Sequence, residues 1–185
     1  MTEPNAASTQ PEDVVAFWRE AGYEKWFARD DAFDAEFRGR FEADHHAAAR
    51  REREAWLDTP DGALALLILL DQFPRNAFRD SGHAFATDPL ARHHAARAID
   101  AGHDAASAPE LRFLYYMPFE HSESIADQDR AIALFTALGD GNYLKYANAH
   151  RDVIVRFGRY PHRNRALGRA STPEEQAWLD AGGGF

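Results

Sequence analysis

The sequence predicts an all-α protein, with about eight helices arranged in antiparallel hairpins. Helix-start and helix-stop signals recur along the whole chain, and most of them combine Thr, Ser or Asp with Pro, or place Gly after a run of apolar positions. No stretch shows sustained apolar and polar alternation with β-branched residues, which a half-buried strand would need. The 185 residues are enough for one domain with its own core, which we expect at 11–185 after a flexible tail at 1–10.

The first two expected helices cover the N-terminal third of the chain. A Thr-Gln-Pro-Glu start opens a helix that continues through about Glu20. Asp30 can cap a second, longer helix, in which Phe recurs at every fourth position from Phe33 to Phe41. We expect this helix to continue through a charged stretch to Trp56.

The next helix is predicted to form the centre of the core. Thr59 and Pro60 begin it, and the run at 63–70 is apolar on every side, as expected for a helix that is buried all round. Asp71 follows this run on the same face, with Arg75 four residues later. A carboxylate inside an apolar helix must be paired, so we expect Asp71 and Arg75 to form a buried ion pair.

Helix caps define the remaining elements. A stripe of apolar and aromatic residues before Gly158 includes His150, which is interpreted as a core histidine with satisfied hydrogen bonds or as a functional one. The expected helices are one from Thr87 to Gly102, a short one from Pro109, one from Ser122 or Ser124 to Gly139, the striped one ending at Gly158, and one from Thr172 through Leu179.

Positive charge is concentrated near the C-terminal end of a chain whose net charge is −9. Residues 151–169 hold six arginines and one acid, Asp152, which gives +5 for the segment. Two interpretations stay open: a structural network of ion pairs with the chain's own acids, or an anion site built from guanidinium groups and Asn164. The overall acidity makes nucleic acid an unlikely partner. The arginines are Arg151, Arg156, Arg159, Arg163, Arg165 and Arg169.

Two helix exits resemble each other. Phe73-Pro74-Arg75-Asn76 and Tyr160-Pro161-His162-Arg163-Asn164 each place an aromatic residue, Pro, Arg and Asn before a Thr/Pro helix start. Two explanations of this similarity stay open. Either both segments simply follow the chemistry that ends helices, or the helical hairpins are duplicated and their Arg-Asn turns face each other across a cleft.

Several motifs resemble those of a bacterial family of uncharacterised proteins, a domain of unknown function. They are LLDQFPRNAFR, AFATDPLA, FLYYMPFEHSES, the pair Asp127-Gln128 and HRDVIVRFGRYPHRNRALGR. The resemblance implies an all-helical, tetratricopeptide-like fold. It implies no catalytic residues, and the 34-residue tetratricopeptide consensus is not legible, so any repeats have diverged.

The segment Glu120-His121-Ser122-Glu123 holds the candidate acid and base. We expect it at a helix start, where backbone N–H groups favour acceptors. Capping with a hydrogen-bonded histidine, a general acid–base pair of His121 and Glu120, and part of an oxygen/nitrogen metal site all fit the pattern.

No metal and no cofactor are expected. The chain has no cysteine, and Glu42-x-x-His45 lacks the second Glu-x-x-His motif of a di-iron bundle. His93-His94 and His103 are expected on the surface. Sequence signatures of hydrolases and nucleotide-binding proteins are absent.

The chain has no membrane-length apolar run and no leader pattern, so we expect a cytoplasmic protein. Two functions remain open, and the oligomeric state is not predicted. One is binding of a small anionic molecule in a cleft, with possible catalysis; the other is a tetratricopeptide-like interaction module that binds a peptide or a partner protein. The expected ligand-binding residues are Arg75, Asn76, Arg156, Arg159, His162, Arg163 and Asn164, with His121 and Glu120 as the catalytic pair.

Overall fold

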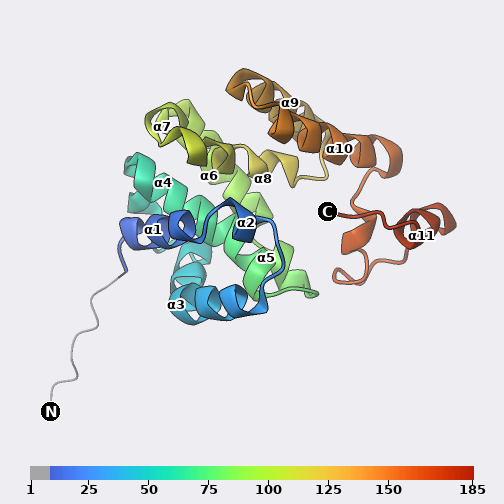
Figure 1. Cartoon of the computed structure of the whole chain (residues 1–185), viewed down its shortest axis with the longest axis horizontal. Helices are drawn as coiled ribbons and strands as arrows, with labels where there is room; N and C mark the ends of the chain where they lie inside the picture. The colour runs from blue at the N-terminus through green and yellow to red at the C-terminus, as the bar shows by residue number, and fades with distance from the viewer. Residues whose placement is uncertain (1–8) are drawn as a thin grey trace, which may run out of the picture.

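The computed structural model describes residues 9–185 and contains no strand within that range, which confirms the all-α prediction (Figure 1). The tail expected at 1–10 lies, apart from its last two residues, outside the described residues. None of the described helices is both long and apolar enough to span a membrane. The α-helices are α1 (Pro11–Ala21), α2 (Tyr23–Trp26), α3 (Asp31–Ala49), α4 (Pro60–Leu67), α5 (Phe73–Ala77), α6 (Asp88–Asp100), α7 (His103–Ala106), α8 (Met117–Glu120), α9 (Ile125–Leu138), α10 (Gly141–Phe157) and α11 (Pro173–Asp180). A π turn, η2 (Ile68–Gln72), joins α4 to α5, and the 3₁₀ segments are η1 (Glu54–Asp58), η3 (Gly82–Phe85), η4 (Pro109–Tyr115) and η5 (Pro161–Arg163).

Local capping signals predicted several helix ends. Asp30 accepts hydrogen bonds from the first turn of α3, Thr59 caps α4, and Thr172 forms a capping box at the start of α11. Gly139 and Gly158 follow α9 and α10 with positive φ angles of 79° and 70°, a conformation that favours glycine.

Helix α3 is shorter than predicted. It ends at Ala49 rather than continuing to Trp56, because Arg51 adopts a left-handed conformation with φ of 64° and the chain then forms the short η1. The side chains of Arg50, Arg51 and Glu52 are largely exposed, so continued helix would have had no apolar face to bury here.

The central helix runs through Pro74 instead of ending before it. Its π turn is the reason: the Phe73 N–H bonds to Ile68 O, five residues back, and Pro74 has no N–H. Backbone carbonyls of this turn therefore accept from side chains of other segments. These bonds are His45 Nδ1 to Leu69 O (2.8 Å), Thr87 Oγ1 to Leu70 O (2.5 Å) and Arg75 Nη1 to Asp71 O (2.8 Å).

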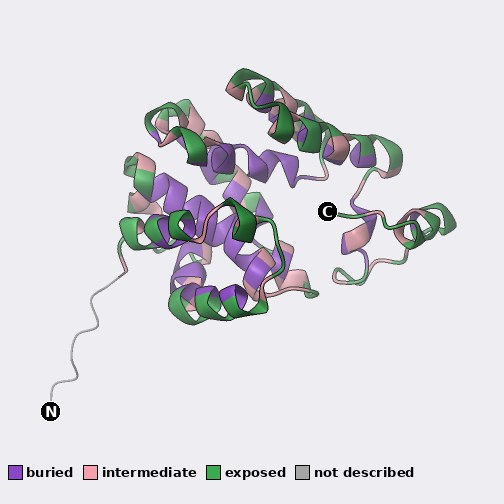
Figure 2. Cartoon of the chain, viewed as in Figure 1, coloured by how far each residue is buried: buried purple, intermediate pink, exposed green. Residues whose placement is uncertain are grey.

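The core surrounds α4 and the π turn, in which every residue from Gly62 to Gln72 is buried, as predicted for 63–70 (Figure 2). Phe17 of α1 packs against three phenylalanines of α3, at ring-centroid distances of 5.2–5.4 Å. Helices α9 and α10 form an antiparallel hairpin beyond α8 (Figure 1). The tetratricopeptide-like arrangement stays a prediction.

The C-terminal segment folds back onto the α8–α9 turn. Glu123 accepts from the Tyr160 N–H (2.8 Å) and from both terminal nitrogens of Arg169 (2.7 and 2.9 Å). Tyr160 is fully buried beside Val153 and Ile154. These contacts place the second of the two similar helix exits, at 160–164, close to the central helix.

Candidate functional site

A cleft of about 870 Å³ lies where six segments meet: α2 with the residues after it, α5, η3, α8, α10 and the C-terminal segment. This volume is in the usual range for small-molecule sites. A second hollow of about 650 Å³ shares Tyr23, Trp26 and Tyr143 with it but has no histidine. The larger cleft therefore holds the candidate chemistry. Its polar wall includes Arg75, Asn76, Glu120, His121, His162 and Arg163.

Arginines from the two similar helix exits meet at one carboxylate. Arg75 binds Asp88 through two nitrogens, with Nη1–Oδ1 of 2.8 Å and Nη2–Oδ2 of 3.0 Å, and Arg163 Nη1 lies 3.2 Å from Oδ2. Both guanidinium groups also lie over the ring of Phe85, at 5.7 and 4.6 Å from its centroid. Arg75 and Arg163 thus face each other at the cleft. This is the arrangement expected if the two similar helix exits lie on opposite sides of a cleft.

Arg163 is the less satisfied of the two arginines. Burial and repulsion by Arg75 lower the pKa of Arg163 to about 10, against the opposing effect of Asp88, so the group is charged at neutral pH. Its Nε is buried with no hydrogen-bond partner among residues 9–185, and so is Nδ1 of the adjacent His162. Burial lowers the pKa of His162 to about 3. Both atoms are enclosed, so a ligand in the cleft would meet the charge of the Arg163 guanidinium group rather than its Nε.

A buried aspartate orients His121. Asp71 Oδ1 lies 2.8 Å from His121 Nδ1 and 3.3 Å from Arg75 Nη1, and Gln72 donates to Oδ2 at 2.6 Å. Burial alone would raise the pKa of Asp71, but the charges of Arg75 and His121 outweigh it and lower the pKa to about 2. Because Asp71 is a carboxylate, His121 donates through Nδ1, and its Nε2 carries the lone pair.

The free side of His121 belongs to the cleft. Burial and the charge of Arg75 lower the pKa of His121, so the imidazole is neutral at neutral pH. Nε2 has no hydrogen-bond partner in the described part of the chain and is not among the fully buried unpartnered atoms. A neutral imidazole held by a carboxylate, with Nε2 open to a cleft, is the arrangement of a general base.

Glu120 forms a second histidine–carboxylate pair, with His150. Glu120 Oε1 lies 2.8 Å from His150 Nδ1, and the same nitrogen is 2.9 Å from Tyr146 O, so Nδ1 faces two acceptors. The rings of His121 and His150 are 6.3 Å apart, and His150 stacks on Phe185 at 3.6 Å. The predicted partners Glu120 and His121 therefore belong to two adjacent pairs.

The turn that carries Glu120 and His121 is held by one buried amide. Gln128 Nε2 donates to Glu120 O at 2.7 Å and to Ser122 O at 2.6 Å, and the Tyr160 hydroxyl donates to Glu120 O at 2.5 Å. The sequence predicts this segment at a helix start. It lies instead at the end of α8, because α9 begins only after a turn whose carbonyls these side chains satisfy.

Comparison with known proteins identifies the family. Residues 14–183 match the model of a bacterial protein family of unknown function, DUF924. The chain belongs to this family. A solved structure of a protein of unknown function from Agrobacterium tumefaciens, ATU0120, is 52% identical, with a TM-score of 0.90 over 92% of this chain and 97% of that one. No curated protein matches the sequence.

In this DUF924 protein, three predicted ligand-binding residues lie away from the cleft. Arg156 pairs with Glu174 at the surface (2.9 Å), and Arg159 binds Glu175 through two nitrogens at 2.6 and 2.8 Å. Asn164 is buried and donates to the same Glu175 at 3.3 Å. These side chains stabilise the C-terminal segment, whereas the six residues of the polar wall named above line the cleft.

Most of the positive segment pairs with the chain's own acids. The network of ion pairs therefore accounts for much of the +5 charge, and Arg163 is the arginine of this segment that reaches the cleft. The pairs are Arg151–Asp129, Arg156–Glu174, Arg159–Glu175, Arg163–Asp88 and Arg169–Glu123.

Sequence reasoning missed Asp88 and Phe85. Asp88 was interpreted only as part of a Thr-Asp-Pro helix start, and local sequence does not distinguish a capping acid from one that binds two distant arginines. Outside the cleft, His45, His46 and His83 are the group within residues 9–185 that could hold a metal ion.

Proposed function

We propose that this cleft binds a small anionic molecule and that His121 accepts a proton from it. The observation that supports the proposal is that a charged guanidinium group and an imidazole acceptor line the same cleft. Arg163 is charged at neutral pH, and His121 Nε2 is an acceptor held in place by Asp71. A donor for a negative group and a base for a proton are what such a site requires.

The charges of the lining favour an anion. Four arginines line the cleft against two acids, Asp80 and Glu120. Each of these arginines also binds an acid that does not line the cleft: the buried Asp34, Asp71 and Asp88, and the exposed Asp31 beside Arg29. An anionic group would therefore meet guanidinium groups that are already paired, and its attraction depends on their lying nearer to the cleft than their acids do. The arginines are Arg29, Arg75, Arg79 and Arg163.

Part of the lining is apolar. Phe85, Met117, Tyr146 and Phe185 contribute to it, and the last two rings are about half exposed, at 50% and 54%. A ligand that combines an anionic group with an apolar or aromatic part would bury these rings as it binds.

The test is a thermal-shift screen with inorganic phosphate first, followed by phosphorylated and carboxylated metabolites. A ligand at 100 times its dissociation constant stabilises the native state by about 2.7 kcal/mol, which is a rise of roughly 5–11 °C for a chain of this size. Arg163→Ala should abolish the shift, and Arg156→Ala, an exposed arginine outside the cleft, should keep it. His121→Gln should keep binding and lose any turnover. The proposal is wrong if no anion gives a saturable shift that depends on Arg163.

A groove for a peptide is the second candidate. Four aromatic residues at the cleft are about half exposed, and exposed aromatic clusters are typical of protein-binding surfaces. Short peptides with aromatic residues, screened by fluorescence anisotropy, should then bind where small anions do not, and Tyr146→Ala should weaken them. The four residues are Tyr23, Phe27, Tyr146 and Phe185.

A further inference from the structure

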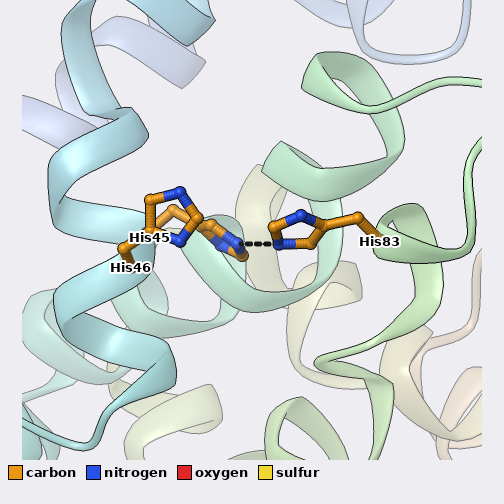
Figure 3. Close-up of side chains that lie close together, drawn as sticks. All are labelled: His45, His46 and His83. Carbon is orange, nitrogen blue, oxygen red and sulfur yellow. Dashed lines mark hydrogen bonds between the residues drawn. The ribbon is translucent and has the colours of Figure 1, made fainter.

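Three histidines from two distant segments converge between α3 and η3. His45 and His46 are adjacent on α3, and His83 lies in η3 (Figure 3). One ring nitrogen from each lies within 4.8 Å of the other two, and the Nε2 atoms of His45 and His83 are 3.1 Å apart. None of the three lines the cleft, so the cluster is independent of the proposed function.

The tautomer of His45 is fixed by the π turn. His45 Nδ1 lies 2.8 Å from Leu69 O, and a carbonyl only accepts, so Nδ1 carries the hydrogen and Nε2 carries a lone pair. Leu69 O is available because the Phe73 N–H bonds to Ile68 O and Pro74 has no N–H. Metal-binding histidines show this second contact, since a carbonyl partner orients the ring toward the ion.

The distances suit a small divalent ion. Zinc–nitrogen bonds of about 2.0–2.1 Å at tetrahedral angles put two ligand nitrogens roughly 3.3 Å apart, close to the 3.1 Å between His45 and His83. A ring nitrogen of His46 lies within 4.8 Å of the other two ligand atoms, and this side chain is 41% exposed, so it has room to move toward an ion. This exposed side also gives an ion a route in, while His45 is fully buried and forms the anchor.

Glu42 and Arg38 are charged side chains next to the cluster. Glu42 Oε1 lies 4.0 Å from His46 Nε2, and the nearby Arg38 is bound to the same carboxylate at 3.0 and 3.2 Å. The arginine charge is thus compensated beside the cluster.

We propose that His45, His46 and His83 bind one divalent transition-metal ion of the zinc type, with a fourth position left to water. Imidazole ligands favour zinc, cobalt, nickel and copper over magnesium or calcium. The sequence predicts no metal because no set of ligands at regular spacing is complete; the third histidine comes from another element of the fold. The bound ion would fasten η3, which also carries Phe85, to α3.

The test uses the untagged full chain after chelator treatment, titrated with Co²⁺ alone and then with Zn²⁺. We expect one Co²⁺ per chain with the strong visible absorption of four-coordinate cobalt, loss of that signal when Zn²⁺ is added, and a higher melting temperature with either ion. His83→Gln should weaken Zn²⁺ binding at least tenfold in calorimetry. His93→Gln, which changes an exposed histidine elsewhere, should leave it unchanged.

Two further variants decide where the ion binds. His46→Gln changes a partly exposed ligand and should also weaken binding without loss of the fold, which circular dichroism checks for every variant. His121→Gln removes an imidazole from the cleft. Zn²⁺ binding that disappears in His121→Gln but survives in His83→Gln would place the ion in the cleft and overturn the proposal, as would the absence of stoichiometric binding to the unaltered chain.

Discussion

Asp88 is expected to be the most sensitive single acid in the protein, because its carboxylate is shared by two buried arginines. The Asp88→Asn change keeps the shape and removes the charge. Its side chain is 9% exposed and that of Arg163 is 7% exposed, so solvent cannot replace the lost interaction. Arg75 retains Asp71 at 3.3 Å, whereas Arg163 loses the one carboxylate that it contacts in the described structure.

The magnitude follows from this imbalance. Removing one partner of a buried ion pair typically costs about 3–5 kcal/mol. Arg75 stays partly compensated, so we expect the lower end, about 3 kcal/mol. In urea, with a slope of roughly 3 kcal/mol per molar, the midpoint should fall by about 1 M. The melting temperature should fall by about 6–12 °C. Tryptophan fluorescence and circular dichroism would follow the unfolding.

A double-mutant cycle separates the charge effect from a general loss of packing. With Arg163→Met in the background, Asp88→Asn should cost about 1–3 kcal/mol less than in the unaltered protein, because the stranded charge is gone. Asp129→Asn is the matched control, since its pair with Arg151 is exposed and should change stability by less than about 1 kcal/mol. Strict additivity, or a cost for Asp88→Asn no larger than that of the control, would refute the reasoning.

Three further changes test other parts of the structure. Thr87→Val removes the hydroxyl that donates to a buried carbonyl of the π turn and should cost about 1–3 kcal/mol in urea melts, whereas Thr136→Val, with an exposed bond of the same kind, should cost less. Gly62→Ala would place a Cβ 2.1 Å from the Trp56 carbonyl oxygen, so the backbone must shift and the melting temperature should fall by an amount equivalent to about 1–3 kcal/mol. His162 is held neutral by burial down to a pKa of about 3, whereas the unfolded chain takes up the proton near pH 6.5. Stability should therefore fall as the pH drops through this range, and His162→Gln should make that slope shallower by up to about 1.4 kcal/mol per pH unit, measured by urea unfolding at a series of pH values.

The sequence predicts those parts of the fold that depend on neighbouring residues. The caps at Asp30, Thr59 and Thr172 join atoms within three residues of each other, so local chemistry is sufficient to identify them. The end of α3 could not be predicted from helix propensity, since charged residues are compatible with helix. It is decided by whether a helix face finds an apolar surface to cover, and that depends on the rest of the fold.

The candidate site was predicted in part for a related reason. Arg75, His121 and Arg163 were identified because charged and polar residues stand out beside apolar helices. The predicted ion pair of Asp71 with Arg75 is confirmed at 3.3 Å. The additional contacts were not predicted: Asp71 lies closer to His121, and Arg75 binds Asp88 more closely. Which acid each basic side chain binds depends on distances between segments that are far apart in the chain. Neither the composition nor the spacing of residues along the sequence gives these distances.

The π turn connects the central helix to both candidate sites. In this turn one hydrogen bond spans five residues instead of four, and Pro74 has no N–H, so backbone carbonyls outnumber backbone donors. An unpaired carbonyl inside the core would cost about 1–3 kcal/mol. Three side chains offset this cost, and each belongs to or adjoins one of the two proposed sites: His45 in the histidine cluster, Thr87 next to Asp88, and Arg75 in the cleft. The same bonds that satisfy the backbone therefore fix the tautomer of His45 and the position of the Arg75 guanidinium. An irregularity that would be a defect in an isolated helix is, in this fold, what orients the polar groups around it.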